Sequence, residues 1–144
     1  MVTVSKLTTA TEGNLEDLQR LIQQLREDPA EHTVPLTDLQ DVISNKYADL
    51  IVAKDGERIV GMATLYVIHK LGKRTGYVED VVVDEKYRGQ KIGEQVLRFL
   101  IDTARQKQIR TLFLTSRPER EAANKLYQKL GFEVKKTNPY RLKL

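Results

Sequence analysis

The residues whose types and spacing could carry out chemistry gather in one turn between a predicted strand and a predicted helix. The turn consists of Arg88, Gly89, Gln90, Lys91, Ile92 and Gly93. Such a turn directs several backbone N–H groups to one point, where the helix dipole favours negative charge. Arg88 and Lys91 add positive charge, and glycine lets the backbone approach a ligand closely. The turn predicts a diphosphate-binding site, with an ordinary tight turn as the alternative.

Two carboxylates, Glu79 and Asp80, stand in the strand that precedes this turn. An alkylammonium group titrates near a pKa of about 10, so an amine must lose a proton to a base before it can act as a nucleophile. Either carboxylate would serve as this base, directly or through a water. Because side chains alternate along a strand, only one of them is expected to face a cleft, and Glu79 is preferred. The alternative is a pair of solvent-facing or ion-paired carboxylates.

Other chemistries find little support in the composition. The chain has no cysteine, and His32 and His69 are isolated, so we expect no disulfide, no thiolate nucleophile and no metal site. The net charge of +4 is spread along the chain, which argues against nucleic-acid binding. No apolar run approaches the roughly 20 residues of a membrane span, and the N-terminus does not resemble a signal peptide. We therefore expect a cytoplasmic protein with no membrane partner.

Hydrophobic periodicity predicts an α/β domain in which these groups are placed by alternating strands and helices. Asn14 is expected to cap the first helix, Asp55-Gly56 to form a hairpin turn, and residues 81–83 to be central in the sheet. The predicted strands are residues 2–8, 50–54, 58–68, 77–83, 111–115, 132–134 and 140–142. The predicted helices are residues 14–26, 36–43, 92–104 and a last one that begins at Ser116–Glu119, turns Ala122, Ala123, Leu126, Tyr127 and Leu130 inward, and ends at Gly131.

Two segments resemble the GNAT superfamily of N-acetyltransferases. Residues 88–93 are similar to its pyrophosphate-binding motif, Q/R-x-x-G-x-G/A, with Arg88 first, Gly93 last and Lys91 in place of the usual middle glycine. Asn124 to Phe132 resembles the late-helix pattern of the superfamily, with Asn124 and Tyr127 three residues apart on one helix face. The run Glu79 to Val83 is similar to that of the glucosamine-phosphate N-acetyltransferase branch.

The resemblance implies a GNAT fold over residues 1–144 as a single domain, with a mixed, mostly antiparallel sheet of six to seven strands flanked by about four helices. It implies that acetyl-CoA is the cosubstrate and that no metal takes part. Its pantetheine arm would lie beside the strand of Val81, Val82 and Val83, where the fourth and fifth strands separate. The amides of Gln90 to Gly93 would hold the pyrophosphate, and the side chain of Asn124 would contact the pantetheine or adenosine-diphosphate arm.

The resemblance also implies a function. The chain would move an acetyl group to a primary amine of a small molecule by direct attack in a ternary complex, with Tyr127 donating a proton to the departing CoA thiolate. The alternative for Tyr127 is a core aromatic residue.

Alternative functions are a protein lysine or N-terminal acetyltransferase, a non-catalytic CoA-sensing domain, and an RNA-binding module. A homodimer is possible. Cations at Lys70, Lys73, Arg74 and Arg141 could meet an acidic group of the substrate or be solvated surface charges.

Overall fold

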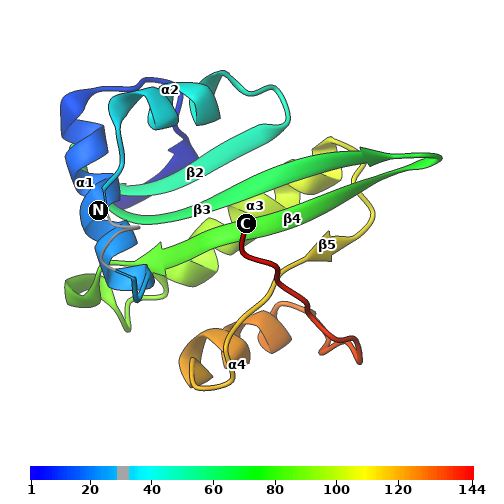
Figure 1. The fold of residues 1–144 in the computed structure, drawn as a ribbon. Coiled ribbons are helices and arrows are strands. Elements are labelled where there is room, and N and C mark those ends of the chain that lie inside the picture. Colours follow the sequence, from blue (N-terminus) through cyan, green and yellow to red (C-terminus); the bar gives the residue numbers. More distant parts are fainter. Residues whose placement is uncertain (29–32) are drawn as a thin grey trace. The chain divides into compact units, whose positions relative to one another are not determined.

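The computed structural model describes residues 1–28 and 33–144, which form two compact units, residues 1–114 and 115–144. Figure 1 shows the helices and strands of the two units. The α/β class predicted from the sequence is confirmed. The first unit contains β1 (Val2–Lys6), α1 (Glu12–Leu25), α2 (Leu36–Ser44), β2 (Ala48–Asp55), β3 (Arg58–Lys70), β4 (Lys73–Val83), the 3₁₀ helix η2 (Glu85–Tyr87), α3 (Ile92–Gln106) and β5 (Leu112–Phe113). The second contains α4 (Glu121–Lys129).

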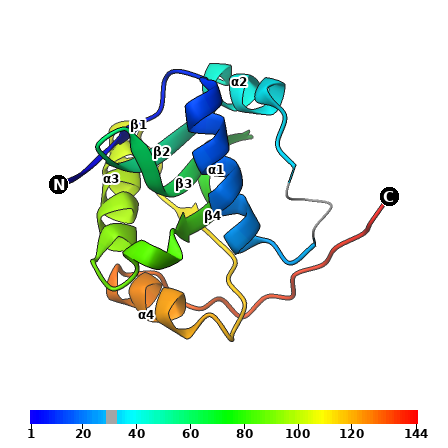
Figure 2. The ribbon, with the colours of Figure 1, turned by 90° about the vertical axis from the view of Figure 1, so that its left-hand side faces the viewer.

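The first unit is a sheet covered by helices on both faces. Its strand order is β1-β2-β3-β4-β5, with antiparallel pairing from β1 to β4 and β5 parallel to β4. Figure 2 shows α1 and α2 on one face and α3 on the other. The first face buries a cluster that includes Leu21 of α1, Leu39 of α2 and Leu50 of β2. On the other face, α3 lies so close that a Cβ on Gly61 would be 3.2 Å from Ile92. The alternating strands and the 3.6-residue period of the helices produce this layering.

Helix α1 begins two residues before its predicted start. Its cap is Thr11, whose hydroxyl accepts a hydrogen bond from the Asn14 N–H at 3.1 Å, so the prediction that Asn14 is the cap was wrong. The Asn14 side chain is buried and donates to the Thr9 carbonyl at 2.9 Å. Asparagine therefore acts here within the first turn of the helix, fixing the segment that leads into it, because a threonine in extended conformation already occupies the cap position.

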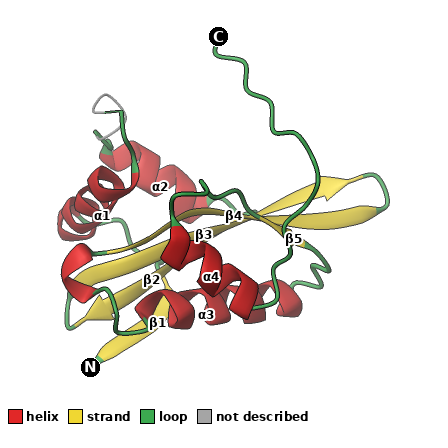
Figure 3. Cartoon of the chain, turned by 90° about the horizontal axis from the view of Figure 1, so that it is seen from below, coloured by secondary structure: helices red, strands yellow, loops and turns green. Residues whose placement is uncertain are grey.

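The hairpins are tighter than the sequence predicted. The turn between β2 and β3 is Gly56–Glu57 rather than Asp55-Gly56, with Gly56 at a φ of 61°. The predicted polar break at residues 72–76 is reduced to Leu71–Gly72, and β4 already begins at Lys73. Figure 3 shows the long β3–β4 hairpin reaching beyond α1 and α2.

The C-terminal third departs most from the prediction. Strand β5 has only two residues and is half-buried, and α4 begins at Glu121, after the predicted start at Ser116–Glu119. Ala122 is exposed rather than inward-facing, and residues 132–144 form no strand, so the sheet has five strands instead of six to seven. A β-strand needs a hydrogen-bonding partner, and the second unit forms no strand with which residues 132–134 or 140–142 could pair.

We predict that Gly76→Ala destabilises the fold by about 1–3 kcal/mol, because it overpacks the contact between β4 and β5. A Cβ on Gly76 would lie 2.5 Å from Leu112 Cδ2, 3.1 Å from Ile109 Cγ2 and 3.2 Å from Leu65 Cδ1. Urea denaturation measures the change. Gly13→Ala is the matched control: its Cβ would meet only the Thr11 hydroxyl, at 4.0 Å, and alanine favours a helix. Equal stabilities of the two variants would contradict this account.

Candidate active site

Strand β4 contains a β-bulge at the two residues that follow Glu79. Met62 of β3 pairs with Val82, and Thr64 pairs with Glu79, so Ala63 alone faces both Asp80 and Val81. Asp80 has a φ of 52°, a left-handed conformation that aspartate tolerates better than most residues. A bulge bends its strand and changes where side chains point. The regular alternation of side chains between the two sheet faces therefore holds up to Glu79 and is interrupted at Asp80.

Glu79 lies on the sheet face that packs against α1 and α2. Its partner Thr64 pairs in turn with Leu50, which belongs to the core under those helices. Glu79 is classed among the exposed residues, yet partial burial, and then the neighbouring Asp80 carboxylate, raise its pKa above the ordinary value. A carboxylate with a raised pKa is a better proton acceptor near neutral pH than an ordinary one.

Asp80 has a different environment. The guanidinium of Arg26, at the end of α1, lies 3.5 Å from the Asp80 carboxylate. Both side chains are about one-third exposed, so the pair adds little to stability. The pair distinguishes the two carboxylates. Asp80 is engaged by a cation, whereas Glu79 has no ion-pair partner among the residues that the structure describes.

Tyr66 joins these groups and was not singled out from the sequence. It lies on β3 opposite Tyr77, two residues from Thr64, and so shares the face of Glu79. Its burial, followed by the Asp80 and Glu79 carboxylates, raises the pKa of its hydroxyl. Only the strand register brings Tyr66 to this place, and a single sequence does not specify a register.

The predicted diphosphate turn forms an open helix N-terminus. Gly89 has a φ of 80° and Lys91 a φ of 62°, and α3 begins at Ile92. No side chain of Lys91 caps the helix, and the first N–H groups of a helix have no acceptor within it. The side chains from Arg88 to Lys91 are largely exposed. We call residues 88–93 the cup; its open amides, helix dipole and cations suit a diphosphate.

Lys91 adopts the left-handed conformation that the usual middle glycine of the motif would favour. The backbone thus keeps the glycine-like shape despite the substitution, at a cost in strain of about 1 kcal/mol. The lysine adds a positive charge in exchange. The departure from the motif therefore changes the electrostatics of the cup more than its backbone.

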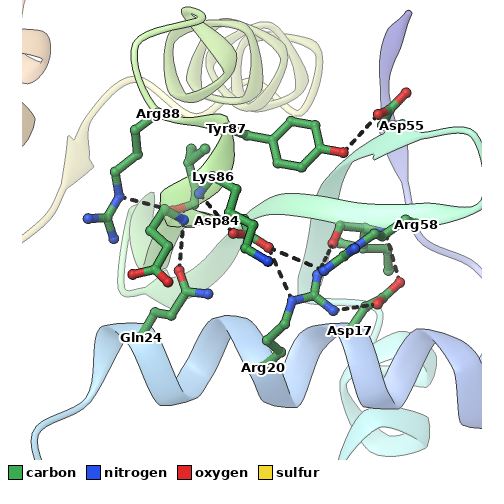
Figure 4. Close-up of polar contacts among 12 residues, drawn as sticks. Asp17, Arg20, Gln24, Asp55, Arg58, Asp84, Lys86, Tyr87 and Arg88 are labelled. Carbon is green, nitrogen blue, oxygen red and sulfur yellow. Dashed lines mark hydrogen bonds and ion pairs between the residues drawn. The ribbon is translucent and has the colours of Figure 1, made fainter.

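A buried carboxylate fixes the chain just before the cup. Asp84 is 1% exposed, accepts hydrogen bonds from Arg20 Nε at 3.1 Å and from the Lys86 N–H at 3.0 Å, and lies 3.8 Å from Arg58 (Figure 4). Burial alone would raise its pKa, but the hydrogen bond from Lys86 and the Arg20 guanidinium outweigh this and leave the pKa below the ordinary range. Asp84 thus holds the end of β4 to α1 and to η2.

Further contacts lock the same segment (Figure 4). Gln24 of α1 accepts a hydrogen bond from the Glu85 N–H at 2.9 Å, and the Tyr87 hydroxyl donates to Asp55 at 2.8 Å. Arg88 Nε donates to the Val83 carbonyl at 3.3 Å, so in this structure that carbonyl already has a partner. The cup is therefore supported by α1, β2 and β4 together.

Strands β4 and β5 meet over a short distance. Leu112 and Phe113 pair with Gly76 and Tyr77, and the ladder does not continue along β4 toward Val81. Beyond Tyr77 the two strands are therefore not paired, as the resemblance implies. Residues 81–83 consequently have a neighbouring strand, β3, on one side only, so the prediction that they are central in the sheet was wrong. Val82 is buried, while Val81 and Val83 are half-buried.

Comparison with known proteins decides the family. Residues 15–132 match the acetyltransferase (GNAT) family. The chain belongs to this family. A glucosamine 6-phosphate N-acetyltransferase of Trypanosoma brucei brucei is 31% identical over 136 residues, 90% of this chain and 89% of the relative. A putative ribosomal protein bS18-alanine N-acetyltransferase of Bacillus subtilis is 27% identical over 94 residues, 65% of this chain and 59% of the relative.

The fold of this GNAT protein agrees with that assignment. A crystal structure of a Trypanosoma brucei acetyltransferase matches it with a TM-score of 0.80 and 28% identity over the full length of both chains. The protein is thus an acyltransferase of the N-acetyltransferase type, and its family uses acetyl-CoA. The prediction of this family from residues 88–93 and 124–132 is confirmed.

Two predicted site residues of the GNAT protein lie in the second unit. The Asn124 amide donates to the carbonyls of Arg117 at 2.9 Å and Arg120 at 2.8 Å, which ties down the start of α4. Tyr127 is 5% exposed and meets Phe132 edge-on, with ring centroids 5.9 Å apart. Burial raises the pKa of Tyr127, with Arg120 opposing the shift, so the phenol holds its proton at neutral pH.

The remaining candidates for other chemistry are few. His69 packs against Tyr47 with ring centroids 5.0 Å apart, and His32 lies outside the described residues. Within residues 1–28 and 33–144 no cluster of three or more His, Cys, Asp or Glu side chains could hold a metal ion. No helix in the same ranges is long and apolar enough to cross a membrane.

We predict that Lys91→Gly is more stable than Lys91→Ala by about 1 kcal/mol, because both remove the charge but only glycine relieves the positive φ. Thermal or urea unfolding measures the difference. The predicted binding of the CoA diphosphate by the cup adds a second expectation. Both variants should bind CoA a few-fold more weakly than the parent, because each lacks the Lys91 cation, and calorimetry measures this. Equal stability of the two variants would show that the left-handed conformation is not maintained at Lys91.

Proposed function

We propose that the protein transfers an acetyl group from acetyl-CoA to a primary amine of a small molecule, by direct attack of the amine in a ternary complex. The observation that carries this proposal is the continuity of β4 with the cup. One strand bears the candidate base Glu79 and leads, through the anchored Asp84, into a helix N-terminus suited to a diphosphate. The name of the trypanosomal relative, a glucosamine 6-phosphate N-acetyltransferase, supports a small amine as the acceptor.

The residues of the cup fit the diphosphate of CoA, because its helix N-terminus is open and carries no capping side chain. The amides of Gln90 to Gly93 would bind the pyrophosphate, and Arg88 and Lys91 would add charge. The strand of Val81, Val82 and Val83 would lie along the pantetheine arm where β5 has ended. Asn124 would contact the same carrier through its side-chain oxygen, since its amide hydrogens already serve α4. When bound, acetyl-CoA supplies the activated acetyl thioester.

In this mechanism Glu79 accepts the proton of the ammonium group, directly or through a water, so that a neutral amine can attack. Asp80 does not share this role, because Arg26 engages it. Its negative charge instead helps to keep the pKa of Glu79 raised. Tyr127, whose phenol keeps its proton at neutral pH, is the proposed donor to the leaving thiolate.

The function is tested by release of free thiol from acetyl-CoA in the presence of a panel of primary amines that includes glucosamine 6-phosphate. Thermal shift with CoA runs in parallel. Stabilisation by CoA without thiol release across the panel would favour a CoA-sensing domain instead. The bacterial relative named for acetylation of a ribosomal protein supports protein N-terminal acetylation as the second candidate, so peptides with a free N-terminus belong in the panel.

We predict that Glu79→Gln lowers kcat/KM by about 100-fold, the usual loss when a general base is removed. Asp80→Asn keeps the base and tolerates the positive φ, so its activity is retained.

The parent kcat/KM rises with pH as Glu79 loses its proton. Removing the Asp80 charge lowers the pKa of Glu79, so this rise moves to lower pH. Full pH–rate profiles, calculated per free amine, measure both effects; an unaltered profile for Asp80→Asn, or full activity of Glu79→Gln, would exclude the assignment.

We predict that Tyr127→Phe lowers kcat by about 10-fold or more while CoA affinity stays the same, because the ring is kept and only the hydroxyl that would donate the proton is lost. Assays of thiol release measure kcat, and calorimetry measures the affinity for CoA. Tyr140→Phe is the control, since Tyr140 is 92% exposed. If both tyrosine variants turn over at the parent rate, Tyr127 is a packing residue and another group protonates the thiolate.

A further inference from the structure

A second site lies at the opposite end of β4 from the cup. A cleft of about 570 Å³ opens where the β3–β4 hairpin, the end of α3 and the start of β5 meet. Figures 1 and 3 show that this end of the hairpin extends beyond α1 and α2. The side chains that line the cleft and matter here are Lys73, Arg74, Thr75, Gln108, Arg110 and Phe113.

The lining of the cleft is cationic. It contains Lys73, Arg74 and Arg110 and no carboxylate. Within the described part of the chain, neither Lys73 nor Arg110 has an ion-pair partner, and Arg74 makes one long hydrogen bond, 3.5 Å, to the Lys107 carbonyl. Three cations around a partly enclosed space repel one another and attract an anion.

Gln108 adds a polar group to the same cleft. It follows the C-terminus of α3 with a φ of 60°, in the position where a helix commonly ends on glycine. The Ile109 N–H bonds to the Ala104 carbonyl at 3.0 Å, which closes this helix end in the usual way. A glutamine here bears strain that glycine would avoid, and what it provides in return is a carboxamide at the cleft.

The cleft and the candidate base share one face of β4. Thr75, Tyr77 and Glu79 are every second residue of β4 before the bulge begins, so their side chains lie on the same face. Phe113 of β5 lies beside Tyr77, with ring centroids 5.5 Å apart, and forms with it an aromatic surface between the two ends. Glu79 lies four residue steps along the strand from Thr75, a distance of about 13 Å at ~3.3 Å per residue.

We propose that this cleft binds a carboxylate or phosphate of the acceptor, about 13 Å from the amine that Glu79 deprotonates. The acceptor is then an extended amine with a distant acidic group, lying over Tyr77 and Phe113. The proposal rests on the proposed function for the identity of the amine end. The proposal that the cleft binds an anion rests on the charges that line the cleft, and binding measurements test it without catalysis.

The binding experiment uses an inert, product-like probe. Tetraglycine acetylated at its N-terminus spans about 13 Å when extended and presents a carboxylate at the far end. Calorimetry should show it binding about tenfold more tightly than its C-terminal amide, because only the acid pairs with the cations. The double variant Lys73→Gln/Arg110→Gln should abolish this preference. The control, Lys46→Gln/Lys54→Gln, removes two charges of the same unit that do not line the cleft and should retain the preference.

A second arm separates the two acidic groups. A peptide amide with phosphoserine in the fourth position carries a phosphate and no carboxylate. If the phosphopeptide alone depends on Lys73 and Arg110, the cleft is a phosphate site; if the free acid alone depends on them, it is a carboxylate site. Either result supports the proposal. Equal binding of acid, amide and phosphopeptide by the parent would overturn it.

Kinetics distinguish the failure of the cleft from the failure of the enzyme. Unacetylated tetraglycine should show a KM about tenfold below that of its amide, and diglycine should show no such preference because its carboxylate does not reach the cleft. Thiol release with equal KM for acid and amide would refute the cleft and leave the acetyltransferase intact. Acid-specific binding of the probe without any thiol release would refute the acetyl transfer and leave the cleft intact. An equal preference with diglycine would refute the spacing.

Discussion

The arrangement of this protein depends on the burial of one carboxylate, Asp84. A buried charge is tolerated only where opposite charges and hydrogen-bond donors surround it, and its partners come from three elements: Arg20 of α1, Arg58 of β3 and the Lys86 N–H of η2. The position where β4 ends is therefore tied to α1. Since the cup follows within a few residues, a single electrostatic requirement fixes where the helix N-terminus of α3 opens relative to the sheet.

The bulge in β4 gives two adjacent carboxylates different surroundings. In a regular strand Glu79 and Asp80 would point to opposite faces, and one of them would have no connection with the site. The extra residue and the positive φ of Asp80 instead bring it to Arg26 while Glu79 stays with Tyr66 on the face beneath α1. Strain of this kind persists only where the surroundings impose it, and here the core pairs on either side of the bulge do so.

The features that the sequence predicted are local ones. Periodicity located α1, α2 and α3, and the types and order of residues 88–93 indicated the cup. The sequence did not predict the bulge, which depends on register, or the Arg20–Asp84 pair, whose members are 64 residues apart. Asn14 was a plausible cap by composition, but Thr11 occupies that position. The alternation at residues 132–134 and 140–142 shows strand propensity without a strand partner, and propensity alone makes no ladder.

Strand β4 acts as the common axis of the proposed chemistry. Along it follow the cationic cleft, the Tyr77–Phe113 surface, the proposed base, the bulge and the anchor of the cup. The cup depends on a network of side chains from other elements, whereas the spacing from cleft to base depends only on the rise of one strand. On this proposal recognition of the acceptor and activation of its amine are mechanically separate: a change in the cleft alters how the acceptor is held without moving Glu79 or the cup. Acceptor preference could then diverge between relatives through the hairpin end and the α3–β5 connection alone, while the grip on the acetyl donor stays the same.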